Sequence, residues 1–208
     1  RLSHWTIAVL FAICWWSAEA DHMAWHLIAG YGVLGTVCFR LVWGFYGGQT
    51  ARFNQFVRGP AATVRYARKL LSRPFARDPA PVGHNPLGAW SVVCLLASLI
   101  SQTVIGLFAV DVDGFESGPL SDHVSFEAGR RFAHWHADIF HLMLVLIGIH
   151  LAAIAYYRIV RKQRLVAAML HGRQSVSASA AAPFFVSPWR AALIATGIFV
   201  VVLILLKL

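Results

Sequence analysis

The chain consists mainly of long apolar stretches separated by shorter polar ones. A helix needs about 20 mainly apolar residues to cross the hydrocarbon layer of a bilayer. Five stretches approach or exceed that length, and we predict a membrane-spanning helix in each of them: residues 2–18, 23–45, 87–110, 132–157 and 189–208. The pattern therefore predicts an all-α integral membrane protein, a bundle of helices that crosses the membrane several times.

The composition supports this class of protein. Hydrophobic residues make up 58% of the chain and charged residues only 13%. A soluble domain carries about 25% charged residues, which it needs to cover its surface. The excess of apolar side chains must therefore face lipid.

The charged residues are segregated between the loops. Basic residues fill the stretches 47–86 and 158–190, whereas the loop between the third and fourth spans is acidic, with Asp111, Asp113, Glu116, Asp122 and Glu127. Basic loops stay in the cytoplasm, so we predict that the N-terminus lies on the cytoplasmic side of the membrane and the C-terminus on the outer side. The net charge of +9 is then a topology signal and a contact with anionic membrane lipid, and it does not indicate nucleic-acid binding.

Four histidines lie at matched depths of the predicted spans. His136 and His150 are 14 residues apart on the fourth span, which is nearly four helical turns, so both rings lie on about the same face and roughly 21 Å apart in depth. The predicted topology places His26 level with His136, near the outer surface, and His4 level with His150, near the inner one. Imidazole is a good axial ligand for haem iron. We therefore predict an outer haem held by His26 and His136, and an inner haem held by His4 and His150.

Other residues near these histidines have two possible roles. Gly30 lies one turn after His26, where a small residue lets a flat macrocycle or a neighbouring helix come close. Arg40 lies level with the inner pair and can hold haem propionates, or can extend its charged end to the inner interface. Gln102, in the third span, can bond a haem edge, a quinone or another helix. His22 is the rival ligand on the outer side, and Asp138 can relay protons or cap the fourth span.

The chain resembles the bacterial cytochrome b561 family, which includes the b-type cytochrome subunits of membrane-bound nickel–iron hydrogenases. The matching stretches are RLSHW at residues 1–5, the segments 26–43 and 136–150, and GHNPLG at residues 83–88. The resemblance covers residues 1–173. It implies a four-helix core with two b haems, ligand roles for His4, His26, His136 and His150, and electron exchange with quinone or with a redox partner such as a hydrogenase or a c-type cytochrome. For a member of a bacterial family, we expect a location in the inner membrane, with the C-terminus in the periplasm. Residues 174–188 are then a flexible cytoplasmic loop, and residues 189–208 an additional transmembrane helix that can dock another subunit.

The predicted function is transmembrane electron transfer, as the electron-transfer subunit of an oxidoreductase that links a periplasmic redox partner to the membrane quinone pool. The acidic loop between the third and fourth spans is either a docking surface for a basic partner or a solvated loop. One alternative is a stand-alone quinone-linked oxidoreductase that acts on a small oxidant such as superoxide. Two alternatives of another class are a transporter with a His and Asp relay and a haem-free membrane scaffold.

Overall fold

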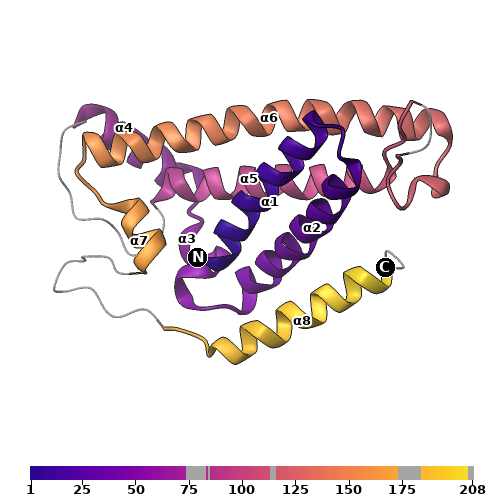
Figure 1. Ribbon diagram of the computed structural model, residues 1–208. Helices are drawn as coiled ribbons and strands as arrows, with labels where there is room; N and C mark the ends of the chain where they lie inside the picture. Colours follow the sequence, from indigo (N-terminus) through magenta and orange to yellow (C-terminus); the bar gives the residue numbers. More distant parts are fainter. Residues whose placement is uncertain (74–82, 84, 113–115, 173–183, 206–208) are drawn as a thin grey trace. The chain divides into compact units, whose positions relative to one another are not determined.

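The computed structural model describes residues 1–73, 83, 85–112, 116–172 and 184–205. Its five long helices are α1 Leu2–Glu19, α2 Met23–Tyr46, α5 Pro86–Phe108, α6 Phe126–Ile159 and α8 Pro188–Leu205 (Figure 1). They coincide with the five predicted spans to within about two residues at most ends. The main difference is α6, which begins six residues before the predicted residue 132.

Three of these helices, α2, α5 and α6, are long and apolar enough to cross a membrane by length and composition. The apolar run of α8 covers the shorter stretch Pro188–Ile204. α1 has only 18 residues, and these include His4 and three tryptophans, whose hydropathy is low. The chain is therefore a multi-pass membrane protein, and the crossings by α1 and α8 stay predictions.

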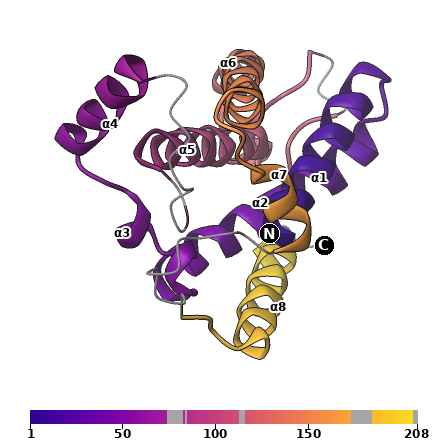
Figure 2. The ribbon, with the colours of Figure 1, turned by 90° about the vertical axis from the view of Figure 1, so that its left-hand side faces the viewer.

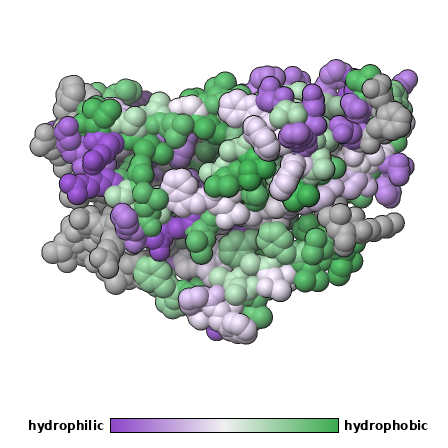
Figure 3. Space-filling view, in the orientation of Figure 1, coloured by the Kyte–Doolittle hydropathy of each residue, from purple (hydrophilic) through white to green (hydrophobic). Residues whose placement is uncertain are grey.

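Exposed apolar side chains mark the surfaces that face lipid. On α6, Leu142, Val145 and Ile149 are exposed, and on α8 so are Leu193, Val201 and Ile204. Hydrophobic residues accordingly cover much of the visible surface of α8 (Figure 3). Contiguous apolar surface of this kind is rare on a soluble monomer, and the bilayer would remove it from water.

Shorter helices occupy stretches that the hydropathy pattern left as loops. They are the 3₁₀ turns Gln49–Ala51 (η1) and Ser121–His123 (η2), and the helices α3 Phe53–Phe56, α4 Pro60–Ser72 and α7 Leu165–His171. α4 begins where Gly59 is extended and Pro60 takes the first helical position. Proline is favoured there because its fixed φ suits a helix and its missing N–H is not needed.

The chain divides into two compact units. We call the first the core unit, formed by Leu2–Leu41, Leu96–Leu144 and Pro188–Leu208. We call the second the basic unit, formed by Val42–Leu95 and Val145–Ser187 together with Arg1. α2, α5 and α6 each contribute one part to each unit.

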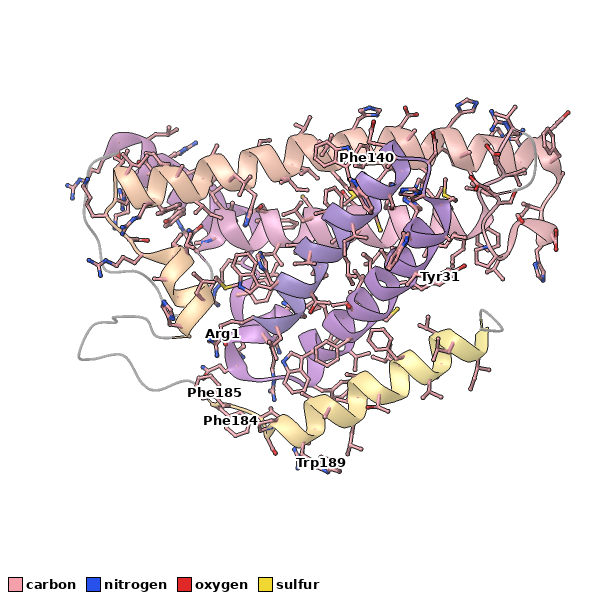
Figure 4. The ribbon with its side chains drawn as sticks, in the orientation of Figure 1. Arg1, Tyr31, Phe140, Phe184, Phe185 and Trp189 are labelled. Carbon is pink, nitrogen blue, oxygen red and sulfur yellow. The ribbon has the colours of Figure 1, made fainter. Side chains whose placement is uncertain are left out.

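Four helices pack together in the core unit. α1 and α2 form a hairpin whose arms lie side by side in both ribbon views (Figures 1 and 2). The buried side chains at the centre come from α2, α5 and α6, and residues of α1 pack against them: Val33, Val37, Leu99 and Met143, with Ile7, Leu10 and Phe11 around them. Phe140 of α6 stacks on Phe11 of α1, with ring centroids 6.0 Å apart (Figure 4).

In the basic unit, polar contacts hold α4 beside α5 and α6. The hydroxyls of Tyr66 and Tyr157 are hydrogen-bonded at 2.8 Å, and Trp90 Nε1 donates to Thr63 Oγ1 at 3.1 Å. Arg161, which is buried, donates from Nη1 to the carbonyl of Arg73 at 2.9 Å. The amphipathic α4 is thus a packed element of this unit.

α6 ends in a left-handed turn. Lys162 has φ 56°, and the N–H of the next residue, Gln163, donates back to the carbonyl of Tyr157 at 2.9 Å. Glycine or asparagine usually occupies such a position, because left-handed backbone costs other residues about 1–2 kcal/mol. The sequence has a lysine at this strained position.

Candidate functional site

The imidazole rings of His26 and His136 face each other across the core unit. His26 projects from α2 and His136 from α6, and their ring centroids lie 6.1 Å apart with an interplanar angle of 70°. Both side chains are half-buried. The structure thus brings together the two histidines that the sequence pairs on the outer side, whereas their role as ligands stays a prediction.

Each ring is fixed by a hydrogen bond to the backbone of a third helix. His26 Nδ1 lies 2.9 Å from the carbonyl oxygen of Cys14 on α1, and His136 Nδ1 lies 3.0 Å from the carbonyl oxygen of Gln102 on α5. A carbonyl oxygen only accepts, so Nδ1 carries the proton in each bond. The lone pair of each ring is then on Nε2, the nitrogen left for a metal, and such bonds orient imidazole ligands and raise their basicity.

The distance between the rings fits a pair of axial ligands. With a metal–nitrogen bond of about 2 Å and the nitrogen roughly 1 Å from its ring centroid, two imidazoles on opposite sides of one iron have centroids roughly 6 Å apart. The observed separation is 6.1 Å. The residues therefore fit a bis-imidazole haem in donor type, tautomer and spacing. No group of three or more metal-ligating side chains gathers among the described residues.

Gly106 on α5 makes room for the His136 ring. A Cβ at Gly106 would lie 2.8 Å from Cε1 and 3.1 Å from Nδ1 of that ring, which is closer than ordinary van der Waals contact. One turn earlier, Gln102 has its side-chain Oε1 buried and without a hydrogen-bond partner among the described residues. A buried acceptor of this kind needs a donor from a bound group or water.

Gly30 and Arg40, singled out by the sequence, both lie on α2 in the core unit. A Cβ placed on Gly30 would meet no neighbouring residue within 4 Å among those that the structure describes. Open space next to the turn that follows His26 suits a bulky bound group, and the predicted close packing of a helix against Gly30 is not seen within the described residues. Arg40 is half-buried, and its predicted contact with haem propionates stays a prediction.

The two histidines of the predicted inner pair, His4 and His150, lie in different units and are described separately. His4 lies on α1 in the core unit, exposed, with its ring 5.2 Å from that of Trp5. His150 lies on α6 in the basic unit and is half-buried. Because the two histidines belong to different units, their pairing stays a prediction.

The remaining histidines are arranged differently from His26 and His136. His134 and His141 are exposed on α6, and His141 Nδ1 bonds to the carbonyl of Ala137 on the same helix. His22, the rival outer ligand, is exposed, and its ring centroid lies 5.6 Å from that of Trp16 with the two rings tilted by 58°. Asp138 is exposed as well. His84, in the GHNPLG stretch, lies outside the described residues.

Sequence reasoning did not identify Gly106 or the two carbonyl partners. The sequence indicated a role for the polar side chain of Gln102, whereas its backbone carbonyl makes the contact with His136. Every residue carries a carbonyl, so the sequence holds no signal for the one that a histidine reaches.

A protein-family comparison agrees with this geometry. The family model described as prokaryotic cytochrome b561 matches residues 1–172, which contain α1 to α7 and all four predicted ligands. No curated protein and no solved structure matches the chain.

Proposed function

Because the chain belongs to the prokaryotic cytochrome b561 family, whose members transfer electrons across membranes through haem b, we propose that it carries electrons through two b haems between a periplasmic redox partner and the membrane quinone pool. Haem iron supplies the one-electron redox chemistry when bound. The observation that carries the proposal is the His26–His136 pair, with both Nδ1 atoms bonded to backbone and a centroid separation of 6.1 Å.

The protein's own residues give the outer site three properties. The carbonyls of Cys14 and Gln102 hold each imidazole in one tautomer, so both rings are oriented before a metal binds. A haem bound here would be held by Nε2 of His26 and Nε2 of His136, and with two imidazole ligands it would supply one-electron redox chemistry. This arrangement favours electron transfer over chemistry on iron-bound oxygen.

His4 and His150 are the proposed ligands of the inner haem, with Arg40 as a partner for its propionates. Support comes from α6, which is one continuous helix from Phe126 to Ile159 and carries both His136 and His150. Their 14-residue separation turns both toward nearly the same side of that helix and separates them by about 21 Å along it. A helix of this length can serve one haem near each membrane surface.

The proposed partner is a periplasmic hydrogenase or c-type cytochrome, since the family is that of hydrogenase-associated membrane cytochromes. Support comes from Glu116 and Asp122 in the segment before α6 and from Glu127 in the first turn of α6, all of which are exposed. Asp113, in the same loop, lies outside the described residues. Exposed carboxylates steer association with a basic partner surface.

The test is haem stoichiometry in single-histidine variants. The purified protein should show about two b haems per chain in a reduced-minus-oxidised spectrum, as four imidazole ligands require. His136→Ala should remove the outer haem and keep the inner one, and His150→Ala should do the reverse. His134→Ala and His141→Ala are matched controls, because these exposed histidines lie on the same helix, and both should keep two haems.

Each other outcome contradicts a defined part of the proposal. Loss of the same haem in His136→Ala and His150→Ala would show that the pairing is wrong. One haem in the unmodified protein would leave the inner pair without support. A folded protein free of haem would exclude electron transfer and favour the transporter or scaffold.

A further inference from the structure

A basic hollow lies at the end of α6 in the basic unit. It has a volume of about 400 Å³ and is lined by Arg158, Ile159, Lys162 and Arg164. The three basic side chains come from the last turn of α6 and from the segment that joins it to α7, and all three are exposed. Hydrophilic residues gather over this end of α6, on the left of the space-filling view (Figure 3).

Among the described residues of the basic unit, there is no carboxylate side chain to balance the charges around this hollow. Only one acidic residue, Asp78, belongs to the stretches that form the basic unit, and it lies outside the described residues. Three cations on one shallow hollow repel each other unless an anion lies between them. The arrangement therefore calls for an anionic ligand that the described part of the chain does not supply.

The backbone at Lys162 is a second, independent observation. The residue adopts a left-handed conformation, with φ 56°, at a helix end where glycine or asparagine is usual. Strained backbone at a non-glycine residue is typical of positions whose side chain serves a function. The neighbouring Arg161 is buried and donates to the carbonyl of Arg73. The left-handed turn at Lys162 therefore follows a buried arginine and precedes Arg164, whose side chain lines the hollow.

The adjoining face of α6 suits a hydrocarbon chain. Ile159, in the hollow, is 65% exposed, and Ala152 and Gly148 lie seven and eleven residues before it, on nearly the same face. Both are exposed, and within the described part of the chain a Cβ placed on Gly148 would meet no neighbouring residue within 4 Å. These small residues leave a smooth open strip that leads from the hollow along the helix.

We propose that this hollow binds the phosphate headgroup of an anionic phospholipid, with Arg158, Lys162 and Arg164 around the phosphate and an acyl chain along Ala152 and Gly148. Basic pockets at the ends of transmembrane helices recognise such headgroups. Gly148 and Ala152 are each two residues from His150, but they lie about 160° away from it around α6. None of the proposed lipid-binding residues is one of the four histidines, so the proposal does not depend on haem binding. It also differs from general attraction of basic loops to the membrane, because it names one place and a stoichiometry of one lipid.

The test is lipid binding to the whole protein in neutral detergent. Native mass spectrometry should find one short-chain phosphatidylglycerol per chain, in preference to phosphatidylcholine of the same chain length. The triple variant Arg158→Gln, Lys162→Gln, Arg164→Gln should weaken binding by roughly a hundredfold, since each charge near an anionic headgroup contributes about fivefold. The control triple Arg58→Gln, Arg65→Gln, Arg68→Gln removes equal charge from exposed positions of the same unit and should change binding less than about threefold.

Two further arms separate the remaining explanations. Lys162→Gly should raise the melting temperature in lipid-free detergent, because glycine adopts the left-handed turn without strain. The same change should weaken phosphatidylglycerol binding. A fall in both the melting temperature and the lipid affinity would mean that the turn is merely structural. Inorganic phosphate should compete only weakly, since it lacks the acyl chain. Equal competition by phosphate would assign the hollow to a free anion, and equal losses in the two triples, or equal binding of the two lipids, would overturn the proposal.

Discussion

The missing side chain of Gly106 lets the His136 ring lie against α5 and bond to the carbonyl of Gln102. A Cβ at this position would lie 2.8 Å from the ring, so the ring would have to move and its 3.0 Å bond to Gln102 would lengthen. At the scale of single residues, the candidate site therefore depends as much on this glycine as on the histidines.

We expect Gly106→Ala to weaken binding of the outer haem by about 10- to 100-fold, as other losses of support for a metal ligand do. Haem content and the g values of the oxidised low-spin signal measure the change. Gly197→Ala on α8 is the matched control, because no neighbour among the described residues lies within 4 Å of its Cβ position. Unchanged haem content and g values in Gly106→Ala would show that His136 is not held as the structure indicates.

α4 shows how an element outside the membrane spans is held in place. Its Tyr66 hydroxyl is bonded to that of Tyr157 on α6 at 2.8 Å, and its Thr63 receives a bond from Trp90 on α5. A single hydrogen bond contributes about 0.5–1.5 kcal/mol, so removing one should loosen the helix without unfolding the protein.

Tyr157→Phe should speed amide hydrogen exchange within α4 by roughly two- to tenfold, the equivalent of one lost hydrogen bond. Tyr66→Phe should have the same effect, and the double variant should add little to either, because both changes remove the same bond. Tyr31→Phe, which removes a half-buried hydroxyl in the core unit, should leave α4 unchanged. Additive effects of the two changes would contradict a direct bond.

The helices show which features a hydropathy pattern predicts. All five long helices were predicted, since each is a long apolar run, but α6 begins at Phe126 and not at residue 132. The added turns contain Glu127, Arg130 and Arg131. Charged residues are rare inside a membrane span but common in helices, so hydropathy alone placed the start of this helix too late. Hydropathy does not predict α4 for a similar reason: its amphipathic pattern covers only 13 residues and contains several basic side chains.

The site was predictable in part. The pairing of His26 with His136 was predictable, because the sequence indicates both the helix that carries each histidine and its depth in the membrane. Their partners were not predictable, because which carbonyl or glycine a ring meets depends on how α1 and α5 pack. The family resemblance is confirmed by the match over residues 1–172, whereas the four ligands stay predictions.

At the scale of the whole molecule, the orientation in the membrane is a prediction from the charges of the loops. In a variant with Cys14, Cys38 and Cys94 replaced by alanine, Asp122→Cys should react with a membrane-impermeant maleimide in intact cells. Ser72→Cys should react only after the cells are permeabilised, because the basic segment that contains it is predicted to be cytoplasmic. Both positions are exposed, so burial does not bias the comparison. The reverse labelling would mean that the topology is inverted.

The length of α6 has a consequence for how the protein is seated in the bilayer. Its 34 residues form a rod about 51 Å long, whereas the hydrocarbon layer is about 30 Å thick. Even at a tilt of about 40°, the largest usually seen in membrane proteins, the rod still spans about 39 Å along the membrane normal. Part of α6 must therefore extend beyond the hydrocarbon layer. Its charged ends, Glu127 at the first turn and Arg158 at the last, can thus reach water or headgroups while the apolar middle fills the membrane.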